Sequence, residues 1–256
     1  MVPESHPSPA SAAPAFYARP RFLAPGAWRD WWSVLHPPYT LLHLSLVTIG
    51  ACLSGPLLLW RLVASLIAFF LAVGVGAHCL DELHGRPLGT TLPRWALLAG
   101  AATGLGGAIA LGVLGVFLVG PWMGAFIVVG AVVAVGYNLE LFAGRLHNRV
   151  VVATAWGGFP ILTAYFAQHD RLGVAAVLAA GFGAMVTLAQ QQLSTPARHL
   201  RRRTASLEGV ARLRDGSEEE VTVDTVLAPL ESALRTLCRA GPLLALALLA
   251  ARVTSH

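Results

Sequence analysis

Residues 57–87 read LLLWRLVASLIAFFLAVGVGAHCLDELHGRP. The run from residue 57 to residue 77 contains a single charged group, Arg61, and the residues after it carry five ionisable side chains, His78, Asp81, Glu82, His84 and Arg86. A helix needs about 20 apolar residues to cross the hydrocarbon core of a bilayer. Ionisable groups directly beside such a helix are usually functional. The stretch therefore predicts a membrane-spanning helix that ends in a polar site.

The composition of the whole chain also indicates a membrane protein. Of its 256 residues, 55% are hydrophobic and only 12% are charged, which is too apolar for a soluble domain. The net charge is +5, but every basic residue other than histidine is an arginine, and these lie mostly between apolar segments. That distribution is typical of membrane topology, so we expect no nucleic-acid partner. The three cysteines form no CxxC pair, so neither a zinc site nor a disulfide framework is expected.

The apolar runs predict an all-α fold, a polytopic transmembrane helical bundle of about seven spans within residues 38–256. Residues 1–37 are predicted to be a disordered cytoplasmic tail ending in an interfacial segment, which holds Trp28, Trp31 and Trp32. A long cytoplasmic loop is expected at 194–225. The expected spans are Tyr39 to Leu53, Leu57 to Cys79, Trp95 to Leu118, Trp122 to Tyr137, Val150 to Gln168, Leu172 to Leu193, and Val226 to Ala251.

Two local patterns predict contacts of the helices. Small residues recur at every fourth position of the third span, at Gly100, Gly104, Ala108 and Gly112, which favours close packing of a neighbouring helix. At the entry to the last helix, Glu231 and Arg235 are spaced as i and i+4, so they lie on one helix face.

The arginines give the bundle an orientation. Cytoplasmic loops of membrane proteins collect arginine, and alternate connections of this chain do so, whereas the others hold almost none. The arginine-rich set is Arg86, Arg94, Arg145, Arg149, Arg198, Arg201, Arg202, Arg203, Arg212 and Arg214. We therefore expect an integral protein of the plasma (inner) membrane with a cytoplasmic N-terminus and an external C-terminus.

The same topology brings three polar groups of residues to the cytoplasmic face. They are the group at residues 78–86, a second that includes Tyr137, Asn138 and Arg145, and a third that includes Gln191, Arg198 and Arg201. A pocket entrance lined by polar side chains, with an apolar bundle behind it, suits a lipid with an anionic head, such as an isoprenoid diphosphate. The Arg201–Arg203 run also suits a patch that contacts bilayer headgroups.

Two motifs resemble the UbiA superfamily of intramembrane prenyltransferases. That superfamily has an Asn-x-x-x-Asp-x-x-x-Asp pattern followed by Arg-Pro, and this chain has Ala77, Asp81 and Gly85 at those positions, followed by Arg86-Pro87. The second motif, at residues 136–141, reads GYNLEL and is similar to the family's Tyr-Ser-x-x-Leu-Lys region. The family's second aspartate-rich motif is absent, because the first acid of the third loop is Glu208.

The resemblance implies transfer of a prenyl group from a polyprenyl diphosphate to an acceptor, assisted by Mg²⁺. Asp81 and Glu82 are the expected catalytic residues and metal ligands, since Mg²⁺ prefers carboxylate, phosphate and water oxygens. The expected substrate-binding residues are His78, His84, Arg86, Tyr137, Asn138, Arg145, Gln191, Arg198 and Arg201. The missing second motif keeps an alternative open, a non-catalytic isoprenoid- or lipid-binding membrane protein or small permease derived from the same fold.

Overall fold

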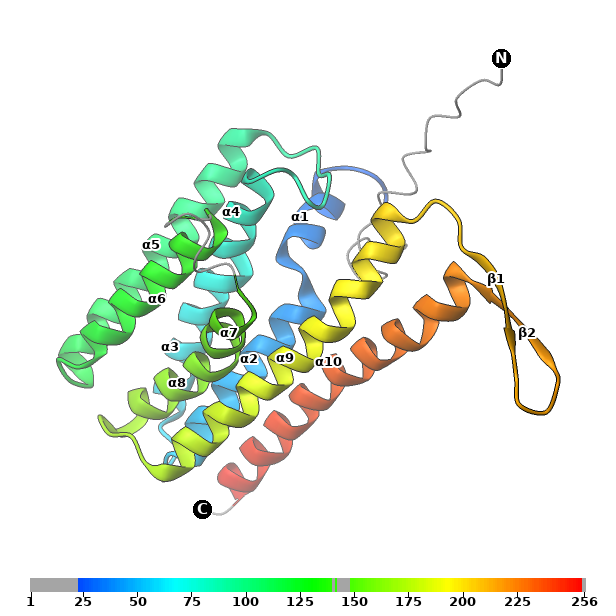
Figure 1. Ribbon diagram of the computed structural model, residues 1–256. Helices are drawn as coiled ribbons and strands as arrows, with labels where there is room; N and C mark the ends of the chain where they lie inside the picture. Colours follow the sequence, from blue (N-terminus) through cyan, green and yellow to red (C-terminus); the bar gives the residue numbers. More distant parts are fainter. Residues whose placement is uncertain (1–22, 140, 142–147, 255–256) are drawn as a thin grey trace.

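The computed structural model describes residues 23–139, 141 and 148–254, so residues 1–22 of the expected tail lie outside the described part of the chain. In the described residues the chain forms a bundle of long helices with one β-hairpin projecting from it (Figure 1). A short helix, α1 (Ala27–Leu35), precedes the bundle and carries the three tryptophans of the expected interfacial segment. Trp28 is exposed, whereas Val34 is fully buried, so α1 is docked on the bundle by one face.

Successive helices of the bundle run in opposite directions (Figure 1). They are α2 (Pro37–Leu53); α3 (Leu59–Phe69), η2 (Phe70–Ala77) and α4 (His78–Leu83), which form one continuous helix; α5 (Arg94–Leu118); α6 (Met123–Asn138); α7 (Arg149–Val152), η3 (Ala153–Gly158) and α8 (Phe159–His169), again continuous; α9 (Val174–Arg203); and α10 (Val223–Thr254). The helical prediction is thereby confirmed.

Five of these helices are long and apolar enough to cross a membrane, namely Leu59–Leu83, Arg94–Leu118, Arg149–His169, Val174–Arg203 and Val223–Thr254. Helices α2 and α6 have 17 and 16 residues and are shorter, so the count of seven spans stays a prediction. Large apolar side chains such as Phe117 and Val174 are about 80% exposed. An exterior of this kind is compatible with a hydrocarbon solvent.

The segment at 194–225 differs from the loop expected there. Helix α9 continues through Pro196 to Arg203, and strands β1 (Glu208–Arg212) and β2 (Glu218–Thr222) pair antiparallel before α10 begins. The turn contains Asp215-Gly216, in which Gly216 adopts a φ of 87° and the Asp215 carboxylate accepts hydrogen bonds from Ser217. An Asp-Gly pair is a common hairpin turn. The hairpin is the exception to the all-α prediction.

Small residues allow the helices to approach closely, as the third-span pattern predicts. A Cβ atom on Gly104 would lie 2.7 Å from the backbone nitrogen of Gly76 in η2, and one on Gly100 would lie 2.7 Å from the sulfur of Cys79 in α4. A Cβ atom on Gly157 of η3 would clash with the backbone of Gly183 in α9, and a Cβ atom on Gly183 would clash with the backbone of Gly157. These contacts hold both π-helical segments, η2 and η3, tightly against their neighbours.

The bundle has two ends. The end that we call the α1 end contains α1, residues 84–93, the last turn of α9 and the first turn of α10 (Figure 1). The opposite end, which we call the C-terminal end, contains the turns at 54–58, 119–122 and 170–173 together with Thr254.

Candidate functional site at the α1 end

The carboxylate of Glu82 is fully buried and holds the connection between α4 and α5. Its Oε2 accepts a hydrogen bond from the backbone N–H of Leu88, and its Oε1 accepts one from the N–H and one from the hydroxyl of Thr90, at 2.8–2.9 Å. Three hydrogen bonds to one buried carboxylate fix this connection firmly. Glu82 thus stabilises the connection between α4 and α5.

A second carboxylate binds the next residue of the same connection. Asp30 of α1 is buried, and its Oδ2 accepts hydrogen bonds from the N–H and the hydroxyl of Thr91, at 2.7 and 2.6 Å. Adjacent threonines therefore bind two acids from two different helices. Through Thr91, the interfacial helix α1 is fastened to the bundle.

Arg86 also acts within this connection. It adopts a left-handed φ of 52°, and its Nη1 donates to the carbonyl oxygens of Thr90 and Leu92, at 3.1 and 2.7 Å. His84, which precedes it, is exposed. Among the acids of the opening motif, Asp81 is the one with an exposed side chain.

Three rings meet beside this connection, where α2 begins and η2 ends. The ring centroids of His36, Tyr39 and His78 lie 5.8–6.2 Å from one another. Burial, followed by the charges of His78, Arg198 and Arg202, lowers the pKa of His36 to about 3. With His36 neutral, the two guanidinium groups nearby make this position attractive to an anion. We call His36, His78, Arg198 and Arg202 the inner cluster.

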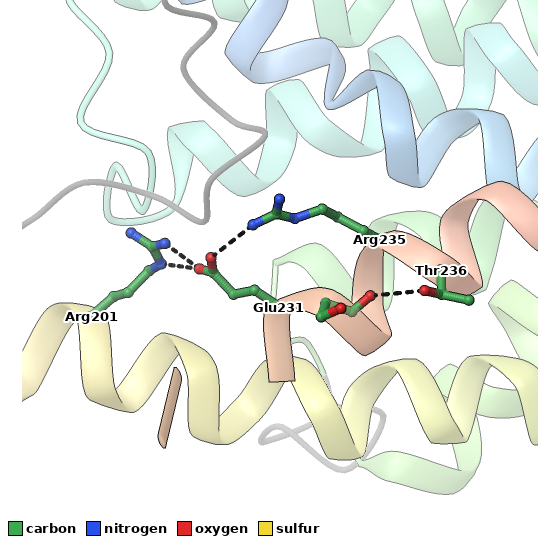
Figure 2. Close-up of polar contacts among 5 residues, drawn as sticks. Arg201, Glu231, Arg235 and Thr236 are labelled. Carbon is green, nitrogen blue, oxygen red and sulfur yellow. Dashed lines mark hydrogen bonds and ion pairs between the residues drawn. The ribbon is translucent and has the colours of Figure 1, made fainter. Parts of the chain in front are cut away.

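Arg201 of the arginine run contacts helix α10. Its guanidinium forms an ion pair and hydrogen bond with the buried carboxylate of Glu231 on α10, and Arg235 approaches the other oxygen of Glu231 at 3.7 Å. Figure 2 shows both arginines directed toward this carboxylate. The expected i, i+4 contact of Glu231 and Arg235 is confirmed.

Three more of the expected site residues, Tyr137, Asn138 and Gln191, lie in the described part of the chain. Tyr137 packs against Trp156, with ring centroids 4.7 Å apart, and the buried Asn138 donates to the carbonyl oxygen of Ala134 in its own helix. The Oε1 atom of Gln191 is buried without a hydrogen-bond partner among the described residues. Arg145 lies outside the described residues.

An elongated apolar cavity of about 210 Å³, open on one side, lies within the bundle, and none of the four inner-cluster residues lines it. At the α1 end it is lined by His43, by Ala77, which directly precedes His78, and by Trp156, the partner of Tyr137. From there it runs between α3–η2, α5, α6 and η3–α8 toward the C-terminal end, where Arg61 lines it. Both π-helical segments contribute to its wall, and such segments are frequent at functional sites.

The possible metal ligands at the α1 end can be compared with those that the expected Mg²⁺ site requires. Within the described residues no three His, Cys, Asp or Glu side chains are grouped so that they could hold a metal ion. Both oxygens of Glu82 already accept hydrogen bonds, which leaves Asp81 as the exposed carboxylate of the motif. One carboxylate with a ligand's phosphate oxygens could hold one Mg²⁺ ion, but the described residues do not fit a two-metal site.

Comparison with known proteins finds no family model, curated protein or solved structure that matches the chain.

Sequence reasoning did not single out His36, His43, Trp156 or Arg61 as site residues. His36 and His43 lie outside the polar groups between spans, and Trp156 lies within an apolar run. The position of Arg61 in the sequence does indicate a functional residue, because a lone charge inside an apolar span is usually functional.

Proposed function

We propose that the protein binds a long-chain isoprenoid lipid within the membrane. The hydrocarbon chain occupies the cavity, and an anionic phosphate head lies at the inner cluster. The observation that carries the proposal is that the two parts are neighbours along one helix: Ala77 lines the cavity and the next residue, His78, belongs to the cluster. A largely apolar pocket with a few convergent polar groups is the usual form of a small-molecule site.

The charges of the cluster support a phosphate head. Arg198 and Arg202 have exposed side chains, and their positive charges lower the pKa of His36. Guanidinium groups bind phosphate through several hydrogen bonds at once. With the expected topology, the head would lie at the cytoplasmic face of the plasma membrane.

Prenyl transfer is the second candidate, and Asp81 supports it. This exposed carboxylate lies on the same continuous helix as the cavity wall, three residues after His78. In such a reaction Mg²⁺ would assist departure of the diphosphate, and Asp81 is the residue that could hold it. Lipid binding is the better supported of the two functions, because Glu82 and Arg201, both expected at the reaction site, are engaged in contacts within the protein.

Binding of geranylgeranyl phosphate to the purified protein in nanodiscs tests the proposal. We expect binding that persists in EDTA and falls at least tenfold in Ala134→Trp, which fills the cavity, and in Arg198→Gln, which removes a charge of the cluster. Val128→Trp is the matched control, since Val128 lies on the same helix as Ala134 but is 62% exposed and does not line the cavity. Equal binding by all four proteins would refute the proposed site.

A separate measurement distinguishes the enzyme. Release of diphosphate from geranylgeranyl diphosphate in the presence of Mg²⁺, abolished by Asp81→Asn, would establish prenyl transfer as the function. Binding without diphosphate release, across several acceptors, would leave the lipid-binding function.

A further inference from the structure

The β-hairpin carries a groove that the proposed function does not use, and we name it the hairpin groove. We propose that it binds the end of α9 of a second copy of this chain, so that two copies in one membrane contact each other reciprocally. The lining of the groove includes three apolar side chains, Leu207, Val210 and Val223, and three carboxylates, those of Glu208, Glu220 and Asp224.

The hairpin groove lies on one face of the hairpin. Glu208 is directly opposite Thr222, and Val210 is directly opposite Glu220. Side chains at opposite positions of paired strands share a face of the sheet, and all four line the groove, whereas Glu219 does not. Val210 is 61% exposed. The groove therefore suits an arginine side chain, whose apolar stem can pack on Val210 while its guanidinium reaches a carboxylate.

The negative charges of the groove are not compensated. Residues 208–224 contain six acidic residues and two arginines, so this segment has a net charge of −4. Among the described residues, the carboxylates of Glu208, Glu220 and Asp224 form neither an ion pair nor a hydrogen bond. Nor are acids of the described chain grouped so that they could hold a metal ion. A surface with charge of one sign attracts a partner of the opposite sign, and here basic side chains fit.

A second copy supplies such side chains at the right place. Helix α9 ends with Arg201, Arg202 and Arg203. Arg201 is paired with Glu231, and Arg202 belongs to the inner cluster, but Arg203 is exposed and forms no ion pair with a described residue. The hairpin and the end of α9 both lie at the α1 end (Figure 1). Two copies inserted in the same orientation therefore present groove and arginine at the same height above the membrane.

The placement of the hairpin allows this contact. Figure 1 shows it beyond α10, directed away from the other helices. The arm from residue 208 to residue 214 is about 20 Å long at the rise of an extended strand. A two-stranded hairpin is at best marginally stable alone in water, so a neighbouring molecule would also stabilise it. If each hairpin contacts α9 of the other copy, a two-fold axis closes the pair.

Charge reversal tests the inference through the molar mass of the purified protein, measured by light scattering in detergent. We expect a dimer at about 0.1 M salt that dissociates at about 1 M, because the screening length falls from about 10 to about 3 Å. Glu220→Arg and Arg203→Glu each bring like charges together, so each should reduce the dimer fraction at least fivefold. The matched control is Glu219→Arg, which makes the same change of charge outside the groove and should stay dimeric.

Mixing the two variants separates a contact between copies from one within a chain. In a mixed pair each groove meets an α9 end of opposite charge. The Glu220→Arg and Arg203→Glu proteins should therefore dimerise together, although neither does so alone. A monomeric wild-type protein, or a dimer that Glu220→Arg does not weaken, would overturn the inference. A monomer whose groove binds a nona-arginine peptide would also overturn it, because the groove would then belong to a different basic partner.

Discussion

Thr90 donates two hydrogen bonds to the carboxylate of Glu82, one from its backbone N–H and one from its hydroxyl, and both end on Oε1. The next residue, Thr91, does the same to Asp30. Two neighbouring residues of one connection thus join α4, α5 and α1. Asp81 and Glu82, the two acids at the end of the first long apolar helix, therefore differ: Glu82 is buried in this arrangement, whereas Asp81 is exposed.

Glu82→Ala should lower the free energy of unfolding by about 3 kcal/mol, because it leaves three buried donors of residues 88–90 without an acceptor. The measurement is thermal or SDS-induced unfolding of the purified protein in detergent. Asp81→Ala, one position away and exposed, should change stability by less than about 0.5 kcal/mol. Similar destabilisation by both variants would show that burial of Glu82 does not matter.

Thr91→Val should detach α1 from the bundle. The variant keeps the side-chain shape and the backbone N–H but loses the 2.6 Å hydroxyl bond to the buried Asp30, a loss of about 1.5–3 kcal/mol for a hydrogen bond to a charged group. Hydrogen exchange of residues 27–35 should become faster, while exchange in α5 should not change. In Thr103→Val, the control, the lost hydroxyl bonded only to its own helix, so α1 should remain protected.

The helices could be predicted from the sequence, because a continuous apolar run must form all its backbone hydrogen bonds internally in hydrocarbon. The spacing of Gly100 and Gly104 likewise predicted close helix contacts, which the structure confirms. These features depend on residues that are near one another in the chain.

The partners of the polar side chains could not be predicted in this way. Glu82 shares a helix face with His78 by spacing, yet it bonds to Thr90, because Gly85 and Gly89 adopt φ values of 89° and 59° that let the chain fold back. Arg201 and Glu231 are 30 positions apart and meet only because α9 and α10 pack together. Such contacts depend on tertiary structure, so an arginine run alone does not show which arginine is available to a ligand.

Acidification should destabilise the protein partly through His36. Its pKa of about 3 in the fold lies below the usual 6.5, so below pH 6.5 the unfolded chain binds a proton that the folded protein does not. The free energy of unfolding should therefore fall as the pH falls from about 6.5 toward 3, by at most about 1.4 kcal/mol per pH unit from this residue.

His36→Asn isolates that contribution. His36 adopts a left-handed backbone conformation with φ of 50°, which asparagine tolerates well, so the turn before α2 is retained. The melting temperature of the variant should depend less steeply on pH between 7 and 5 than that of the wild-type protein. Parallel pH profiles would show that His36 is not held neutral by its burial and by the nearby His78, Arg198 and Arg202.

The ion pair between α9 and α10 gives the last prediction. Glu231→Ala should destabilise the protein by about 3 kcal/mol, because Arg201 would lose the partner of its largely buried guanidinium. Arg235→Ala should cost less than about 1 kcal/mol, since Arg235 is half exposed and 3.7 Å from the carboxylate. Both are measured by unfolding in detergent.

The double variant Arg201→Met with Glu231→Leu separates the cost of an unpaired charge from the worth of the pair. Replacing a buried ion pair by apolar side chains of similar size is often neutral or stabilising, so this variant should regain most of the stability lost in Glu231→Ala. It should also keep its affinity for geranylgeranyl phosphate, because the charges of Arg198 and Arg202 act on His36, whereas Arg201 is paired with Glu231. A stable double variant that no longer binds the lipid would instead place Arg201 at the headgroup.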